Sequence, residues 1–522
     1  MAQKKRFNIT GPCIPALHYM VDTSEMIDLI FSDYVDAGEY FTMNRARQYG
    51  KTTTLKLLTK QLSDRYIVID MSFEGKDEYF ASLSTLAEGI RRRVLTLLQK
   101  SSEALSDIFG KPIDKDFPMS DLGQRITALC DRAGKPVVLL IDEVDKASDN
   151  QVFMTFLGVL RDMYIEQASG NDKTFHSVIL AGVHDVKNLK MKLRPDEKHS
   201  YNSPWNIAAR FDVDMSFSAP EIAAMLYEYE NDHPTGMDAE KVAQRLFYYT
   251  SGYPFLVSLL CKTMDEERLN WTDNGVDEAE KRAIRASNTL FDDLIKNLVN
   301  NPSFSALVER IVVRGARVAF EIHNPNIDLG LMYGIFSDED GQIKVSNIIF
   351  ETVILNYLVS IAETNDLIDR YVDERGRFLR SGKLNMPLVL ERFAAFMRCE
   401  YRDEDGTFIE REGRLLFLSF LKPLINGTGH YVVEPETRGS RRMDVVVFYG
   451  GEEHIVELKI WHGEQAANEA YEQLSGYLLS QEQRVGYLLS FCDNQKSPRE
   501  GRTVEYNGCQ IIEVIVSYRD KE

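Results

Sequence analysis

The stretch TMNRARQYGKTTTLKLL, residues 42–58, decides the expected fold of this chain. It begins in an apolar run (40–43) that reads as a strand, continues as a polar loop, and reaches Gly50, Lys51 and Thr52, which open a helix of apolar period. A strand, a loop and a helix in this order, with Gly-Lys-Thr at the turn, form a cradle for phosphate groups. Lys51 is expected to reach the β- and γ-phosphates, and the Thr52 hydroxyl is expected to hold Mg²⁺.

The loop as a whole is expected to bind a nucleotide, because N–H groups at the amino end of a helix point at the phosphates. One position departs from the full phosphate-loop pattern, since Arg45 stands where the first glycine is expected. A basic loop before an ordinary helix is the alternative interpretation of this stretch taken alone. The expected nucleotide-binding residues are Arg47, Gln48, Tyr49, Gly50, Lys51, Thr52 and Thr53.

A second motif favours the phosphate loop over that alternative. Residues 135–149 read KPVVLLIDEVDKASD, in which an apolar run delivers Asp142 and Glu143 at its end. This pattern is typical of a buried parallel strand whose carboxyl end carries ligand-binding groups. Asp142 is expected to share a Mg²⁺ ion with Thr52, and Glu143 to orient or deprotonate the attacking water. The two motifs together predict that the chain binds a nucleotide.

Further strands and a rigid turn complete the expected nucleotide-binding module. Residues 65–73 (RYIVIDMSF) and 175–183 (FHSVILAGV) read as buried strands of the same sheet. His184 or Asp185, after the later strand, is a candidate sensor of the γ-phosphate, with a solvated loop as the alternative. Pro254, in the turn SGYP that opens a helix, is expected in a lid over the base.

The motifs RARQYGKT, LLIDEVDK, ILAGV and SGYP together resemble those of AAA-ATPase-like proteins of the archaeal-ATPase/STAND type. In that group the phosphate loop often carries arginine where the first glycine is expected, so the resemblance accommodates Arg45. It covers residues 10–360 and implies a P-loop core, a helical lid and a winged-helix domain. The segment GIF…DGQIKV fits the winged helix, because it reads as a hairpin across Asp340 and Gly341. Few basic residues lie near this hairpin, so a packing or regulatory module is preferred over a DNA-binding one.

A second candidate site lies near the C-terminal end of the chain. Within YVVEPETRGSRRMDVVVFYGGEEHIVELKIW, residues 431–461, Gly450 and Gly451 read as a hairpin turn. If these two glycines are the whole loop, paired residues have numbers that sum to 901, and Asp444 faces Glu457. Directly opposed carboxylates are destabilising in a plain sheet, but a divalent cation between them would explain the pair.

Lys459 completes a set of three chemical groups on this hairpin. It lies two residues beyond Glu457 and therefore shares its face. A four-residue loop would instead oppose Asp444 to Lys459 and would keep all three residues on one face. Two carboxylates and a lysine arranged in this way are typical of a metal-dependent phosphodiesterase, in which the acids hold Mg²⁺ and the lysine positions or activates the attacking water.

The spacing D-(12 residues)-E-L-K resembles the core of the PD-(D/E)XK nucleases, with Met443 where that pattern has proline. The resemblance implies further site residues. Glu412 matches the acidic residue that the first helix of that core often adds to the metal site. Gln473 and Tyr477 match the polar and aromatic positions that follow the E-x-K strand, and their spacing places them on one helix face. An ordinary salt-bridged hairpin in a small α/β domain is the alternative.

Composition and charge limit the classes of protein to which this chain can belong. Of the 522 residues 44% are apolar and 27% are charged, as in folded multidomain proteins. There is no apolar run long enough to span a bilayer and no export signal, so no membrane association is expected. The six cysteines are scattered without a C-x-x-C pair, which fits a reducing cytoplasm. A net charge of −19 argues against a general nucleic-acid-coating protein but leaves room for a local basic groove or for metal-bridged contacts.

The expected fold class is a multidomain α/β protein. Its expected parts are a P-loop parallel-sheet ATPase core (1–218), a helical lid (219–275), a winged-helix-like domain (276–362), a helical linker (363–405) and a restriction-endonuclease-like α/β domain (406–522).

The expected function is that of an ATP-binding and ATP-hydrolysing protein whose Mg²⁺-dependent nuclease domain cleaves nucleic acid, with DNA as the favoured substrate, under ATP control. The combined architecture resembles bacterial proteins associated with defence or mobile elements. A protein partner or self-association is compatible with the acidic surface. The alternatives are a nucleotide-switched signalling or scaffold protein whose nuclease-like domain only binds, and a DNA translocase.

Overall fold

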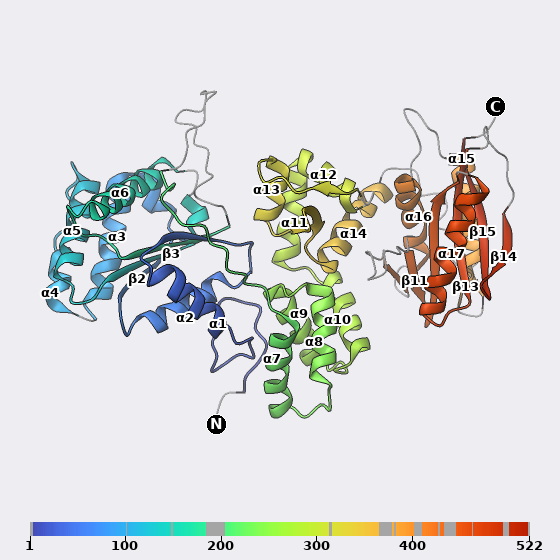
Figure 1. Ribbon diagram of the computed structural model, residues 1–522, viewed down its shortest axis with the longest axis horizontal. Coiled ribbons are helices and arrows are strands. Elements are labelled where there is room, and N and C mark those ends of the chain that lie inside the picture. Colours follow the sequence, from blue (N-terminus) through green and yellow to red (C-terminus); the bar gives the residue numbers. More distant parts are fainter. Residues whose placement is uncertain are drawn as a thin grey trace. The chain divides into compact units, whose positions relative to one another are not determined.

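The computed structural model divides the chain into two compact units, Met1–Leu290 with Glu321–Ser337, and Phe291–Phe320 with Asp338–Glu522 (Figure 1). Among the residues named above, His184, Asp185, Met443 and Asp444 lie outside the part of the chain that the structure describes. The described residues are 4–100, 102–147, 150–183, 204–312, 316–364, 378–380, 383–400, 410–425, 429–432, 445–461, 463–493 and 501–519.

The first unit is built on a four-stranded parallel sheet with the order β1-β4-β3-β2. Its strands are β1 (Tyr40–Asn44), β2 (Ile67–Ser72), β3 (Val137–Asp142) and β4 (Ser177–Gly182). Every residue of β3 and β4 is buried, which explains why their sequences are apolar almost throughout. The expected strands are therefore confirmed. The insertion of β4 between β1 and β3 does not follow from the order of the strands in the sequence.

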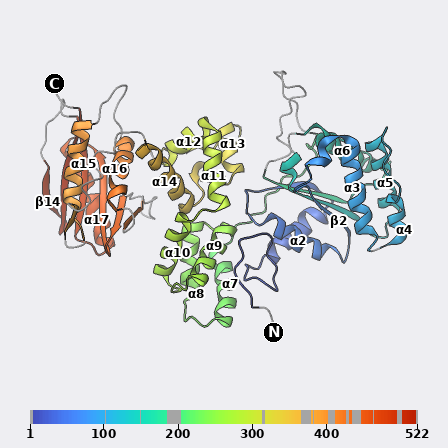
Figure 2. The ribbon, with the colours of Figure 1, turned by 180° about the vertical axis from the view of Figure 1, so that it is seen from behind.

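Helices cover both faces of this sheet (Figures 1 and 2). Leu139 and Leu180 point to the face that packs against α3 (Leu83–Leu98), α5 (Pro118–Arg132) and α6 (Gln151–Ala168). Leu140 and Ile179, one position away on each strand, point to the face that packs against α1 (Ser24–Ile30) and α2 (Lys51–Leu62). The alternation of strand side chains thus gives the sheet two apolar layers, and α2 is held with its amino end at the carboxyl end of β1.

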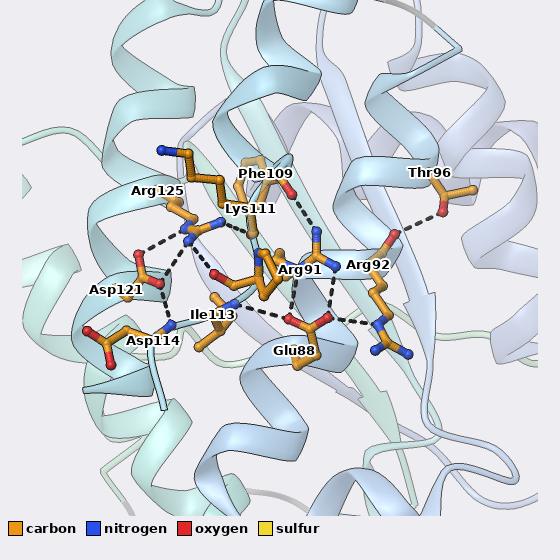
Figure 3. Close-up of polar contacts among 11 residues, drawn as sticks. Glu88, Arg91, Arg92, Thr96, Phe109, Lys111, Ile113, Asp114, Asp121 and Arg125 are labelled. Atoms are coloured by element: carbon orange, nitrogen blue, oxygen red, sulfur yellow. Dashed lines mark hydrogen bonds and ion pairs between the residues drawn. The ribbon is translucent and has the colours of Figure 1, made fainter. Parts of the chain in front are cut away.

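Two arginine–carboxylate pairs fasten the segment 109–114, which leads into α5 (Figure 3). Arg91 donates two hydrogen bonds of 2.8 Å to Glu88, and Arg125 donates two of 2.9 Å to Asp121. The same side chains also bind the backbone of the segment, since the arginines donate to its carbonyl groups and the carboxylates accept from its N–H groups. The segment therefore has a fixed path, although only Phe109, the end of a 3₁₀ turn, belongs to regular secondary structure.

A bundle of four helices follows the sheet within the first unit. Its helices are α7 (Ala219–Asp232), α8 (Ala239–Thr250), α9 (Pro254–Glu266) and α10 (Asp273–Arg285). The first unit also includes α13 (Pro325–Met332). Across the described part of the chain, no helix combines the length and the apolar character that a membrane crossing requires.

The hairpin expected across Asp340 and Gly341 is present. It consists of β6 (Phe336–Glu339) and β7 (Gln342–Val345), and β7 also pairs with the short strand β5 (Val318–Ala319). The neighbouring helices are α11 (Thr289–Asn300), α12 (Pro302–Val312) and α14 (Ile348–Thr364). A winged-helix domain remains a prediction for this region.

The second unit contains a six-stranded mixed sheet with the order β10-β11-β12-β13-β15-β14. The strands β12, β13 and β15 run parallel to one another. The other pairs are antiparallel, namely β11 with β12, β10 with β11, and β14 with β15. The bounds are β10 (Gly429–Val432), β11 (Val445–Tyr449), β12 (Glu452–Ile460), β13 (Val485–Asp493), β14 (Arg502–Tyr506) and β15 (Cys509–Arg519).

Helices lie on both faces of this second sheet as well. The helix α17 (Glu464–Ser480) packs against the face that carries Ile455 and Leu488. On the opposite face Phe491 meets Phe393 of α15 (Met386–Glu400), with ring centroids 6.4 Å apart, and lies against Gly413 of α16 (Glu410–Ile425). The helix α15, which falls within the expected linker 363–405, therefore packs on the sheet of the C-terminal part.

Candidate functional site

The phosphate loop joins β1 to α2 and holds the Lys51 ammonium group against its own backbone. Gly50 has a φ of 84°, a left-handed conformation that glycine adopts without strain, and Lys51 begins the helix directly after it. Lys51 is 8% exposed and donates from Nζ to the carbonyl oxygens of Arg45 and Ala46 at 2.8 and 2.9 Å. The ammonium group is thus held at the amino end of a helix, where anions bind favourably.

The charges around Lys51 come from the end of β3. Burial lowers the pKa of Lys51, and the negative charges of Asp145, Glu143 and Asp142 oppose that shift because they favour the ammonium form. An ammonium group that is buried in this way needs compensating carboxylates. The carboxylates at and just after the end of β3 therefore stabilise the charged form of Lys51 in the loop.

The Thr52 hydroxyl donates a hydrogen bond of 2.8 Å to Asp142 Oδ2, which joins α2 to the carboxyl end of β3. Asp142 is 8% exposed, and its other oxygen accepts the backbone N–H of Glu143 at 2.9 Å. The structure therefore brings together the two groups that the sequence assigns to Mg²⁺. Hydroxyl and carboxylate oxygens are suitable ligands for this ion, so the residues present fit it.

Glu143 has an unusual backbone and an altered acidity. Its φ of 58° lies in the left-handed region, which residues other than glycine rarely adopt. Burial raises the pKa of Glu143, and the negative charge of Asp142 raises it further. A carboxylate of raised pKa is better suited to accept a proton from water, which fits the role assigned to Glu143.

Three of the expected loop residues fasten the loop to later segments of the first unit. Gln48 donates from its amide to Thr289 Oγ1 at 2.9 Å. The ring of Tyr49 packs edge-on against Tyr253, with ring centroids 4.6 Å apart. The Tyr253 hydroxyl in turn donates to the carbonyl oxygen of Arg47. The phosphate loop is thus held in place by the side chains of Thr289 and Tyr253.

Thr53 and Pro254 contact their surroundings in different ways. The Thr53 hydroxyl oxygen accepts the backbone N–H of Cys13 at 3.0 Å, so the segment before α1 reaches the start of α2. Pro254 is buried as the first residue of α9, and the preceding Tyr253 makes the contacts with the loop. The expected turn therefore lies against the phosphate loop.

The contacts of Arg45 explain why an arginine stands where the phosphate-loop pattern has its first glycine. Its guanidinium group donates to the carbonyl oxygens of Asn44, at 2.9 Å, and of Val213. It also lies 5.1 Å from the centroid of the Phe211 ring. Its backbone N–H donates to the carbonyl oxygen of Gly182 at 3.1 Å. The arginine side chain thus anchors the loop to the segment 211–213.

Asp145 is a residue of this site that the sequence reasoning did not single out. Its Oδ2 accepts the backbone N–H of Val183 at 2.6 Å, which joins the ends of β3 and β4. The signal that could have found it is the third acidic residue in LLIDEVDK, three positions after Asp142.

The C-terminal hairpin has the predicted two-residue turn. Gly450 and Gly451 have φ values of 57° and 79°, which is the conformation that such a turn requires. The strands pair from Val445 with Val456 to Tyr449 with Glu452, so the predicted sum of 901 is confirmed. Asp444 lies outside the described residues, and its position opposite Glu457 remains a prediction.

Glu457 and Lys459 form an ion pair on β12. The Glu457 side chain is fully buried, and Lys459 Nζ lies 2.9 Å from its Oε1. Both side chains lie on the face that packs against α17, because Ile455, two residues before Glu457, belongs to that apolar cluster. A buried carboxylate is tolerated only with such a partner.

The other residues implied by the nuclease resemblance lie on the two neighbouring helices. Tyr477 of α17 is buried in the cluster on the Glu457 face, and Gln473 lies one helical turn before it. Glu412 is part of α16, and its side chain is outside what the structure describes. Among the side chains that are described, no group of three His, Cys, Asp or Glu residues is arranged to hold a metal ion.

A second buried carboxylate, Glu513 of β15, lies on the same face of the sheet. It accepts hydrogen bonds from Ser490 Oγ at 2.6 Å and from the Tyr471 hydroxyl, and Arg502 Nε lies 3.4 Å from its Oε2. The sequence carries no signal for this network, because Glu513 is a single acidic residue between apolar neighbours in β15.

Comparison with known proteins shows a family match over most of the chain. Residues 16–353 match the family model described as an AAA-like domain. No sequence match to a curated protein was found.

Several solved structures resemble the chain weakly. A Walker-type ATPase of Pyrococcus abyssi is 13% identical, with a TM-score of 0.45, over 67% of this chain and 99% of that one. The Orc1 protein of Aeropyrum pernix, in complex with DNA, is 11% identical, with a TM-score of 0.30, over 65% and 93%. The Orc2 protein of the same organism, with ADPNP and ADP, is 10% identical, with a TM-score of 0.34, over 64% and 93%. Identities and TM-scores this low support no conclusion about function.

Proposed function

This chain belongs to the AAA-like family of ATPase-type proteins, and from that premise we propose that its first unit binds ATP with Mg²⁺ and hydrolyses it. The observation that carries the proposal is the 2.8 Å hydrogen bond between Thr52 Oγ1 and Asp142 Oδ2. It sets the hydroxyl of the phosphate loop beside the carboxylate at the end of β3, as two ligands of one Mg²⁺ ion would be set.

The side chains of the site have separate roles in this proposal. Lys51 would exchange its bonds with the loop carbonyls for bonds with the β- and γ-phosphate oxygens. Thr52 and Asp142 would hold Mg²⁺, which neutralises phosphate charge when it is bound. Glu143 would accept the proton of the water that attacks the γ-phosphorus, as the bond to the leaving ADP oxygen breaks.

The test is a comparison of nucleotide binding and ATP hydrolysis in the wild type, Lys51→Ala and Glu143→Gln. Lys51→Ala is expected to bind ATP poorly, because it lacks the cation that meets the phosphates. Glu143→Gln is expected to bind ATP like the wild type and to hydrolyse it at least about 100-fold more slowly. Binding of ATP by Lys51→Ala with wild-type affinity would contradict the assignment of the phosphate loop.

For the second unit we propose a metal-dependent nuclease that cleaves nucleic-acid phosphodiester bonds, with DNA as the favoured substrate. The buried Glu457–Lys459 pair supports this proposal, together with a hairpin whose described pairs, from Val445 with Val456 to Tyr449 with Glu452, follow the predicted register. In the proposal Asp444, Glu457 and Glu412 hold Mg²⁺, which activates the attacking water when it is bound, while Lys459 and Gln473 orient that water and the scissile phosphate.

We further propose that ATP binding controls this nuclease. Cleavage of labelled single- and double-stranded DNA and RNA, with Mg²⁺ or Mn²⁺ and with or without ATP, tests the idea in the wild type, Lys51→Ala and Glu457→Ala. Cleavage that is lost in Glu457→Ala and altered by ATP and by Lys51→Ala is the expected result. ATP binding without cleavage of any substrate would favour the alternative, a nucleotide-switched scaffold whose nuclease-like domain binds a nucleic acid or protein partner.

A further inference from the structure

The last residues of β4 are tied to both neighbouring strands at the edge of the sheet where the nucleotide is expected. On the β1 side, the carbonyl oxygen of Gly182 accepts the backbone N–H of Arg45, in the phosphate loop, at 3.1 Å. On the β3 side, the N–H of Val183 donates to Asp145 Oδ2 at 2.6 Å. Because β4 lies between β1 and β3, these two bonds connect the phosphate loop to the chain that follows Glu143.

The packing at this point leaves no free space. A Cβ atom added to Gly182 would lie 2.8 Å from Val144 Cγ2 and 2.9 Å from Asp145 Oδ1. Both distances are shorter than van der Waals contact, so a larger residue would push against the side chains of Val144 and Asp145. The absence of a side chain at Gly182 therefore allows the end of β4 to lie close to the turn after β3.

We propose that Asp145 is a positioning residue of the ATP site, which holds the end of β4 so that the phosphate loop and Glu143 keep a fixed separation. The inference rests on the ATP hydrolysis proposed above. In this role Asp145 touches neither phosphate nor Mg²⁺ and acts through Val183, Gly182 and Arg45.

The consequence is a larger effect on turnover than on binding. Hydrolysis needs Lys51, on the β1 side, and Glu143, on the β3 side, to be aligned around one phosphorus atom. A displacement of 1 Å in such an arrangement costs about 100-fold in rate. Binding relies mainly on the loop and the amino end of α2, where the charge of Asp145 near Lys51 is expected to matter less than the alignment of the two sides. Loss of the Asp145 contact is therefore expected to lower kcat by about 10- to 100-fold, with nucleotide affinity changed by less than about 3-fold.

The experiment compares Asp145→Ala, Asp145→Asn and Gly182→Ala in the full chain. Asparagine keeps an oxygen that can accept the Val183 N–H, so it separates the hydrogen bond from the charge. Asp131→Ala is the matched control, because Asp131 is an exposed carboxylate of the same unit, paired with Lys173 at 2.7 Å. The readouts are kcat for ATP, nucleotide affinity, and hydrogen exchange of the Val183 and Arg45 amides.

The expected result is that Asp145→Ala and Gly182→Ala lower kcat and speed the exchange of both amides, while Asp145→Asn and the control remain close to the wild type. Unchanged exchange in Asp145→Ala would overturn the inference. The inference would also be overturned if Asp145→Asn hydrolysed ATP as slowly as Asp145→Ala while its Val183 amide stayed protected from exchange. In that case hydrolysis would depend on the negative charge of Asp145 and not on its hydrogen bond to Val183. If the wild type does not hydrolyse ATP, the proposed function fails by itself. Exchange of the Arg45 amide in Asp145→Ala then decides the positioning role.

Discussion

Thr52 Oγ1 and Asp142 Oδ2 lie 2.8 Å apart although 90 positions separate the two residues in the sequence. The contact joins the first turn of α2 to the last residue of β3, and so connects the two motifs that define the site. A hydroxyl and a carboxylate held in this way can exchange their mutual hydrogen bond for a shared Mg²⁺ ion.

Removal of either group should therefore weaken the effect of Mg²⁺ on nucleotide affinity. Thr52→Ala and Asp142→Asn are expected to bind ATP about equally with and without Mg²⁺, whereas the wild type should bind it more tightly with the ion. Titration of a fluorescent ATP analogue at several Mg²⁺ concentrations measures this dependence. Thr59→Ala serves as the control, because the Thr59 hydroxyl only donates to the carbonyl oxygen of Leu55 on the same helix. A Thr52→Ala variant with full Mg²⁺ dependence would contradict the assignment.

The acidity of Glu143 predicts the shape of the pH profile of ATP hydrolysis. Burial and the charge of Asp142 raise the pKa of Glu143 above its ordinary value of 4.5. Because a general base must be deprotonated, kcat should rise with pH through this raised pKa and then level off. In Glu143→Gln this rise should be absent from the residual activity. A wild-type profile without this rise would argue against Glu143 as the base.

The Glu88–Arg91 pair predicts a pH-dependent contribution to stability. Hydrogen bonding from Arg91 lowers the pKa of Glu88 from 4.5 to about 2. A carboxylate whose pKa is lower in the folded state stabilises the fold above its unfolded pKa, and this contribution is lost as the pH falls from 4.5 towards 2. Glu88→Gln is expected to lower the free energy of unfolding by about 1–2 kcal/mol at pH 7, and less at low pH.

Urea unfolding at pH 7 and at pH 3 checks this prediction. The control is Asp131→Asn, because its ion pair with Lys173 is well exposed and should contribute little at either pH. If Glu88→Gln lowered the free energy of unfolding equally at both pH values, the negative charge of Glu88 would not be the source of its contribution to stability.

The Glu457–Lys459 pair predicts an asymmetry between two substitutions. Lys459→Ala leaves the fully buried carboxylate of Glu457 without its cation at 2.9 Å, whereas Glu457→Gln leaves a partly exposed lysine that can reach water. Lys459→Ala should therefore lower the melting temperature more than Glu457→Gln does. If Glu457 binds metal, Mn²⁺ should restore part of the stability of Lys459→Ala and have no such effect on Glu457→Gln. Thermal melts with and without Mn²⁺ distinguish these outcomes, and equal shifts in both variants would contradict a metal site at Glu457.

The local features of both sites follow from the sequence by itself. Gly50 and Lys51 open a helix after a strand, and Asp142 ends an apolar strand, because such elements depend on neighbouring residues and on periodicity. The pairing of Val445 with Val456 is equally local, since a two-glycine turn leaves one register for the strands that it joins.

Only the tertiary structure decides which distant residues meet. The position of β4 between β1 and β3 brings Gly182 to Arg45 and Val183 to Asp145, and no local pattern encodes that strand order. The same holds for Glu513, whose partner Ser490 lies on the neighbouring parallel strand. Parallel strands are joined by long crossovers, so the sequence specifies each strand while the packing of the helices on both faces selects its neighbours.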